Sequence, residues 1–137
     1  TGHKGKKHFM SSGHNVGKKA REMKTVRLAF EKIELKLKKN PVEVLVKAIE
    51  NAAPREEVIS IEYGGARYPK AVESAPQRRV DLALRFMTQG AYSRSFNKKT
   101  SIVDALANEI MEAYHGTANS TAVSKKRDIE RQAASSK

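Results

Sequence analysis

A short segment with two-residue periodicity separates stretches whose apolar residues recur every three or four positions. Between about Glu57 and Glu73, β-branched and aromatic residues stand on either side of Gly64-Gly65. Glycine tolerates the positive φ angles of tight turns, so this segment predicts a β-hairpin. A lone two-stranded hairpin is only marginally stable in water, so it must lean on helices or project towards a partner. The sequence therefore predicts a mainly α fold: a single helical bundle domain with one protruding β-hairpin arm.

Helical periodicity covers the rest of the chain from about residue 19. The apolar faces that we expect to be buried in the successive helices are Val26, Ala29, Phe30, Ile33 and Leu37; Val42, Leu45, Val46, Ile49 and Ala53; Val80, Ala83, Leu84, Met87 and Ala91; Ile102, Leu106, Ile110 and Tyr114; and Val123, Ile129 and Ala133. Five helices are expected in total. The last helix, over about residues 121–134, is rich in charge and should lie at the edge of the domain.

Several helix ends carry local sequence signals. Asn40 suits an N-cap and Pro41 the first helical position, where its missing N–H costs nothing. Ser101 with Asp104 resembles a capping box for the fourth helix, and Gly116 suits its C-terminal stop. These signals predict where the second and fourth helices begin and where the fourth ends.

The charge of the chain is large and uneven. The 27 Lys and Arg residues exceed the 15 Asp and Glu residues by 12. Residues 1–40 carry 12 basic and 3 acidic side chains, a net charge of +9, whereas the other 97 residues carry 15 and 12, a net charge of +3. Such an excess favours nucleic acid or an anionic membrane face as partner.

The first 18 residues predict a flexible basic N-terminal arm that precedes a helical domain over residues 19–137. The arm is rich in Gly, Ser, His and Lys and has too few apolar residues to offset its ordering entropy. Each of its lysines can neutralise a phosphate and release a counterion. The alternative is a solubilising tail or a cloning remnant. The lysines concerned are Lys4, Lys6, Lys7, Lys18 and Lys19.

Two further groups of residues are candidates for RNA contact. Arg78 and Arg79 stand in the first turns of the third helix, whose positive end favours phosphate oxygens. The alternative is ion pairing with Glu73 or Asp81. At the hairpin tip, Arg67, Tyr68 and Lys70 combine cationic and aromatic groups that can hold backbone and stack on bases. The alternative there is a simple cross-strand pair of Tyr63 and Tyr68.

Other classes of protein find no support in the sequence. The chain has no cysteine, which suits a reducing compartment. It has no apolar run near the roughly 20 residues of a membrane span and no signal-peptide core. We therefore expect a soluble, cytoplasmic protein without a membrane partner.

No constellation of residues indicates catalysis or metal binding. His3, His8 and His14 lie in the arm without a register that would converge them on a metal. Ser101 and His115 have no acid partner for a triad, and the hairpin glycines lack the end of a phosphate loop. We expect no enzyme activity, no cofactor, no metal and no small-molecule substrate.

Longer motifs carry a resemblance to a known family. The stretch NPVEVLVKAIENAAPREEV, the YGG turn and APQRRVDLALRF closely resemble the archaeal form of small-subunit ribosomal protein seven, as do SGHNVGKK and the terminal KKRDIERQAASSK. The resemblance covers nearly the whole chain. It implies a structural component of the small ribosomal subunit that binds the 3′ major domain of its rRNA and nucleates assembly of the subunit head. It also implies neighbouring head proteins, and positions near the exit-site tRNA and the mRNA path.

The family also implies which residues contact RNA. The basic arm, the helix starts and the hairpin base do so there, while the hairpin arm and the last helix lie near the tRNA and mRNA. On the matching motifs these residues are Lys18, Lys19 and Arg21 after GHN, Arg67 and Tyr68 after YGG, Arg78 and Arg79 of PQRR, and Lys125, Lys126 and Arg127 in the last helix. Lys24 of the first helix, Lys70 of the hairpin and the arm lysines complete the predicted set.

One departure from the family and one rival function stay open. Family members usually carry a further amphipathic helix where Phe9 is here followed directly by Met10, and we interpret this as residues missing between the two. A winged-helix type of DNA-binding regulator is the alternative function, because helices followed by a hairpin also occur there. Its recognition helix would be the third, which carries Arg78, Arg79 and Arg85.

Overall fold

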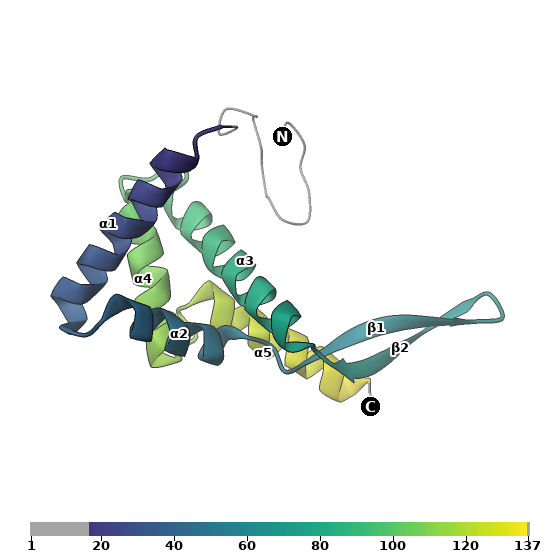
Figure 1. Cartoon of the computed structure of the whole chain (residues 1–137). Coiled ribbons are helices and arrows are strands. Elements are labelled where there is room, and N and C mark those ends of the chain that lie inside the picture. The colour runs from purple at the N-terminus through teal and green to yellow at the C-terminus, as the bar shows by residue number, and fades with distance from the viewer. Residues whose placement is uncertain (1–16, 137) are drawn as a thin grey trace.

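The computed structural model describes residues 17–136, which form five helices and one hairpin (Figure 1). In chain order the elements are α1 Lys19–Leu37, α2 Pro41–Ala52, β1 Glu56–Tyr63, β2 Ala66–Glu73, α3 Pro76–Ser95, α4 Ile102–His115 and α5 Thr121–Ser135. The helices pack into one bundle, and the hairpin projects from one end of it. The predicted mainly α fold with a protruding hairpin is confirmed. The arm predicted over residues 1–18 and the suspected gap after Phe9 lie almost entirely outside the described residues.

The helix ends follow the local sequence signals. The side chain of Asn40 accepts a hydrogen bond from the Val42 N–H at 3.0 Å, with Pro41 in the first turn. The hydroxyl of Ser101 accepts one from the Asp104 N–H at 3.2 Å. Gly116 ends α4 in the left-handed conformation, with φ 71°. These three predictions are confirmed because each depends only on residues within one turn of helix.

The hairpin has a regular antiparallel register. It runs from the pair Glu56–Glu73 to the pair Tyr63–Ala66, next to the turn. Gly64 and Gly65 form the two-residue turn with φ angles of 56° and 84°. Positive φ at both central positions matches the twist of the flanking strands, which explains why two glycines stand there.

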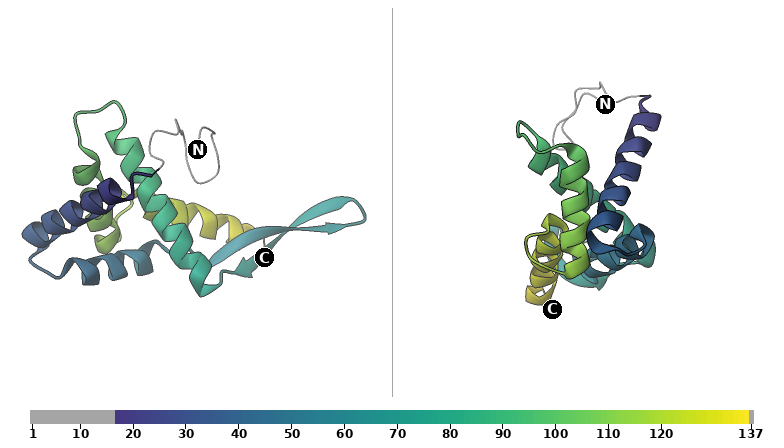
Figure 2. Two further views of the ribbon diagram at one scale, coloured as in Figure 1. Left: turned by 45° about the horizontal axis from the view of Figure 1, so that its top comes forward. Right: turned by 90° about the vertical axis from the view of Figure 1, so that its left-hand side faces the viewer.

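Helix α4 lies at the centre of the bundle and packs against α1, α2 and α3 (Figure 2). Its buried residues include Ala105, Ala107 and Ala113, which let the neighbouring helices approach closely. Ala29 and Ile33 of α1 and Met87 of α3 complete this part of the core. The core therefore consists mainly of small side chains with a few large ones between them.

The predicted buried face of α2 is partly wrong. Ala53 is buried, and Leu45 and Ile49 pack against the core as predicted, but the two valines of this face do not. Val42 and Val46 are 56% and 51% exposed, whereas Val44, Ala48 and Ala52 are fully buried. Ala48 and Ala52 on the inner face allow close approach to α4, and two of the three valines, Val42 and Val46, face solvent. The same outcome holds for four residues predicted to be buried in the other helices, which are between 37% and 40% exposed: Val26, Val80, Leu84 and Ile102.

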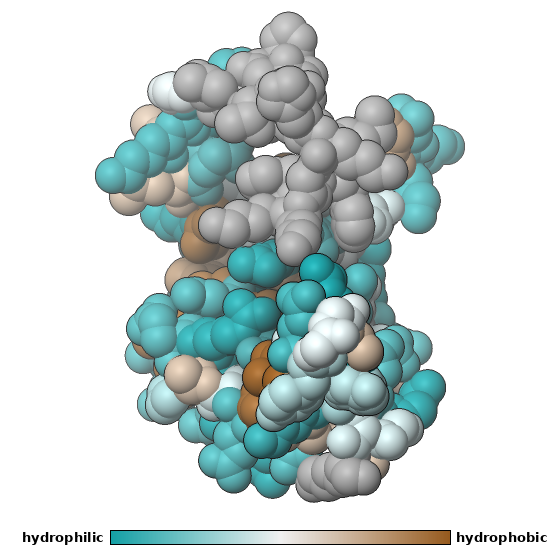
Figure 3. Space-filling view, turned by 90° about the vertical axis from the view of Figure 1, so that its right-hand side faces the viewer, coloured by the Kyte–Doolittle hydropathy of each residue, from teal (hydrophilic) through white to brown (hydrophobic). Residues whose placement is uncertain are grey.

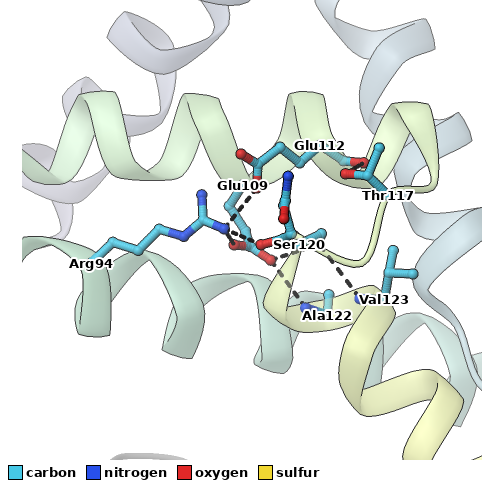
Figure 4. Close-up of polar contacts among 8 residues, drawn as sticks. Arg94, Glu109, Glu112, Thr117, Ser120, Ala122 and Val123 are labelled. Atoms are coloured by element: carbon cyan, nitrogen blue, oxygen red, sulfur yellow. Dashed lines mark hydrogen bonds and ion pairs between the residues drawn. The ribbon is translucent and has the colours of Figure 1, made fainter.

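A buried polar network joins the start of α5 to α3 and α4 (Figure 4). Glu109 of α4 accepts hydrogen bonds from the Ser120 hydroxyl at 2.8 Å and from the Ala122 N–H at 3.0 Å. Arg94 of α3 lies 3.4 Å from the other Glu109 oxygen and donates to Glu112 at 2.7 Å. The carboxylate of Glu109 thus pairs with one free N–H and with the capping hydroxyl at the start of α5, and it helps to fix this helix on the bundle.

No helix within residues 17–136 combines the length and the apolar character that crossing a membrane would require.

Candidate nucleic-acid interface

The hairpin is the most exposed part of the described chain. Every residue from 62 to 70 is exposed, and the two strands meet the helices at their base, where they pack against α5 and pair with Arg78 of α3. Figures 1 and 2 show the strands extending well beyond the bundle. This ribbon is free on both faces to contact a partner.

One face of the hairpin is apolar and aromatic. Strand residues alternate between the two faces, and the register places Ile59, Ile61 and Tyr63 on the same face as Tyr68 and Lys70. The Tyr63 and Tyr68 rings lie 6.2 Å apart between centroids, yet remain 65% and 54% exposed. The cross-strand tyrosine pair is therefore confirmed, and stacking of bases on these rings stays a prediction.

The other face carries Arg67. The register pairs Arg67 with Glu62, and alternation puts it on the face opposite to Tyr68 and Lys70. Within residues 17–136 neither Arg67 nor Lys70 has an ion-pair partner within 4.0 Å. The predicted hairpin residues thus point to two sides of the ribbon, and a nucleic acid that contacts all three must enclose it.

Arg78 forms an ion pair at the base of the hairpin. Its Nε donates to both Glu57 oxygens, at 2.7 and 2.9 Å, and this hydrogen bond raises the pKa of the Arg78 guanidinium. The alternative of ion pairing is therefore correct in kind, but the partner is Glu57 on β1 rather than Glu73 or Asp81. The Arg78 side chain is still 52% exposed, so its remaining nitrogens can meet a phosphate.

Arg79 is placed differently from its neighbour. It is half-buried, and its Nε is enclosed without a hydrogen-bond partner in the described part of the chain. An enclosed donor of this kind is unfavourable unless something pairs with it. Of the two arginines, only Arg78 is exposed on α3.

The three basic residues of α5 that are predicted to contact RNA are engaged within the protein. Lys125 lies over the Phe86 ring, with its Nζ 5.6 Å from the centroid. The Lys126 ammonium donates to the Asn51 carbonyl at 3.2 Å, and Arg127 donates to the Gly116 carbonyl at 3.4 Å. The last two contacts place positive charge at the ends of α2 and α4, where a helix dipole favours it. These residues hold helices together, and RNA contact by them stays a prediction.

The predicted residues at the start of α1 are exposed and lie apart from the hairpin. Lys18, Lys19, Arg21 and Lys24 all face solvent, and Arg21 pairs with Glu22 at 3.2 Å. Figures 1 and 2 place this end of α1 away from the hairpin tip, with α3 running between the two regions. The predicted residues therefore form separate basic regions rather than one compact site. Lys4, Lys6 and Lys7 lie outside the described residues.

The surface around the hairpin is mainly hydrophilic, with a few small apolar patches beside the ribbon (Figure 3). In the described part of the chain, no group of three His, Cys, Asp or Glu side chains could hold a metal ion. A basic helical bundle with an exposed hairpin arm that carries charged and aromatic groups has features typical of nucleic-acid-binding proteins.

Comparison with known proteins identifies the family. Residues 3–137 match the sequence profile of the family described as ribosomal protein S7p/S5e. The chain belongs to this family, whose role is structural and not enzymatic.

Curated relatives from archaea carry the name small ribosomal subunit protein uS7. The protein of Nanoarchaeum equitans is 54% identical over 137 residues, which is all of this chain and 69% of the relative. That of Archaeoglobus fulgidus is 50% identical over 93% of this chain and 66% of the relative. That of Halobacterium salinarum is 45% identical over 94% and 61%. The chain thus spans about two thirds of the length of these relatives.

Proposed function

We propose that this chain is an rRNA-binding structural component of the cytoplasmic small ribosomal subunit. Membership of the ribosomal protein S7p/S5e family is the observation that carries the proposal. The net charge of +12 supports it, because a polyanion offsets the self-repulsion of a small basic protein. The exposed cations of the hairpin and of the α1 start supply groups for phosphate contact.

The finer role follows from the family resemblance. The chain binds the 3′ major domain of small-subunit rRNA and nucleates assembly of the head beside neighbouring head proteins. The hairpin and α5 lie near the exit-site tRNA and the mRNA path. The exposed hairpin supports this placement, because only a projecting element can reach past the RNA that the bundle contacts.

The RNA-binding mechanism is electrostatic positioning with recognition of shape. Lys and Arg make up 27 of 137 residues, whereas aromatic residues make up only 6%. Phosphate contacts position a protein without reading sequence, and folded rRNA offers a distinctive arrangement of phosphates. The residues proposed for contact are those predicted from the sequence; among the cations, Arg67 and Lys70 are exposed on the hairpin and Arg78 is half-exposed at its base.

Binding to a fragment of the 3′ major domain, measured across a range of salt concentrations, tests the proposal. Log affinity should fall with log salt by about 0.7–0.9 for each phosphate contact. Duplex DNA of similar length serves as the competitor. Equal affinity for both nucleic acids, or affinity that hardly changes with salt, would contradict the proposal.

The structure does not support the alternative of a winged-helix DNA-binding regulator. Its recognition helix would be α3, but Arg78 is held by Glu57 and Arg85 is half-buried. Side chains held in this way cannot all reach base edges in a major groove.

A further inference from the structure

A groove lies between α1 and the start of α4, and none of the residues predicted for RNA contact lines it. Its volume is about 440 Å³. Its polar lining consists of Lys32, Lys36, Lys99, Thr100, Asp104 and Asn108. Three of these six residues are lysines, one is an acid and two are neutral donors.

The groove keeps a surplus of positive charge after its internal pairing. Lys32 pairs with Asp104, which cancels one charge of each sign. Lys36 and Lys99 have no ion-pair or hydrogen-bond partner within residues 17–136. Three lysines against one aspartate leave a net charge of +2. An anion that enters the groove therefore meets two ammonium groups that nothing else in the described chain neutralises.

The start of α4 adds to the attraction. The groove is lined by Thr100, just before the Ser101 N-cap, and by Asp104 in the first turn. The free N–H groups of a helix start carry a partial positive charge. Asp104 opposes this charge, and the two free lysines reinforce it.

The groove is remote from the hairpin. Figure 1 places α1 and the hairpin tip at opposite sides of the molecule, with α3 and α5 between them. A ligand in the groove is therefore held independently of the hairpin interface. A large partner that contacts both the groove and the hairpin would use a different segment for each.

We infer that the groove between α1 and α4 is a second binding site for the phosphate backbone of RNA, which rests on the proposed rRNA-binding function. Lysine ammonium groups act as point charges that bind phosphate without demanding a fixed geometry. Thr100 and Asn108 can donate hydrogen bonds to phosphate oxygens. The protein then contacts rRNA on both sides of the bundle, and binding at one site raises the effective concentration at the other.

A pair of matched double variants tests this inference. Lys36→Gln with Lys99→Gln removes the two free charges of the groove. Lys38→Asn with Lys47→Gln removes two charges from exposed positions outside it, and asparagine tolerates the positive φ of 55° at residue 38. Both variants have the same net charge, so any difference between them reports on location rather than on total charge.

The measurement is affinity for a fragment of the 3′ major domain of small-subunit rRNA at several salt concentrations. The groove variant should bind about 10-fold to 100-fold more weakly at low salt, with a salt slope lower by about 1.4–1.8, or two contacts. The control variant should stay close to the unchanged protein. Circular dichroism should show both variants folded, because all four positions are exposed.

A variant that raises the positive charge of the groove provides a second test. Asp104→Asn releases Lys32 from its partner and raises the charge of the groove from +2 to +3. Affinity for the fragment should then increase several-fold. Equal affinity of the groove and control variants would overturn the inference and leave the proposed function intact. An unchanged protein that does not bind the fragment would overturn both.

Discussion

Glu109, which is fully buried on α4, accepts a hydrogen bond at 2.8 Å from the hydroxyl of Ser120, the residue that caps α5. The same hydroxyl also accepts a hydrogen bond from the Val123 N–H at 3.4 Å. One buried carboxylate and one hydroxyl thus hold the first turn of α5. This contact anchors the start of the helix that carries three consecutive basic residues.

Glu109→Ala should lower the free energy of unfolding by about 3–5 kcal/mol, because it leaves Arg94 and the start of α5 without their partner in the interior. Urea unfolding measures this change. Glu112→Ala is the matched control, since its side chain is 33% exposed and also contacts Arg94. An effect of Glu109→Ala no larger than that of the control would show that the buried network contributes little.

Gly90 has no room for a side chain. A Cβ at this position would lie 2.8 Å from Thr121 Cβ and 3.1 Å from Glu109 Cδ. Gly90→Ala should therefore destabilise the fold by about 1–3 kcal/mol through overpacking, even though alanine favours helix. Adding Thr121→Gly should restore most of the lost stability, because it removes the side chain that the new Cβ would meet; thermal unfolding measures this change. A Gly90→Ala variant as stable as the unchanged protein would contradict this packing.

The local features of the fold could be predicted from the sequence, and the tertiary ones could not. Asn40-Pro41 and Gly64-Gly65 determine a helix start and a turn within four residues, so both predictions hold. The buried face of α2 depends on how closely α4 approaches. Periodicity cannot show that Ala48 turns inward while Val46 turns outward, because apolar residues occupy both faces.

The same contrast between local features, which the sequence predicts, and tertiary contacts, which it does not, applies to the candidate site. Motif matching could select Arg78, but not its partner Glu57, because the contact depends on how the hairpin base meets α3. Lys36 and Lys99 carry no motif and lie far apart in the sequence, so only the fold brings them to one groove. The nearest signal in the sequence was the spacing of Lys32 and Lys36 on one side of the first helix.

Lys126 should contribute to stability rather than only to RNA binding. Its ammonium donates to the Asn51 carbonyl near the end of α2, and the contact is partly buried. Lys126→Ala should cost about 1–2 kcal/mol of unfolding free energy, towards the low end for a hydrogen bond from a charged group because this contact is only partly buried. Lys70→Ala on the exposed hairpin should change stability by less than about 0.5 kcal/mol. Equal stability of the two variants would show that the Lys126 contact is unimportant.

Glu57 should act as an internal competitor for the RNA that Arg78 binds. Arg78 donates to both Glu57 oxygens, so a phosphate must share or replace this carboxylate. Glu57→Gln removes the negative charge and should tighten binding to the rRNA fragment several-fold, whereas Arg78→Ala should weaken it about 10-fold or more. Arg78 is 52% exposed and Glu57 18% exposed, and neither belongs to the apolar core, so both variants should remain folded.

The double variant separates the two roles of this pair. If Arg78 binds phosphate, Glu57→Gln should give no gain in affinity once Arg78→Ala is present, because the carboxylate then has no arginine to release. An equal gain in both backgrounds would mean that Glu57 only repels RNA and that Arg78 is a structural residue. Filter binding at a fixed low salt concentration measures all four proteins.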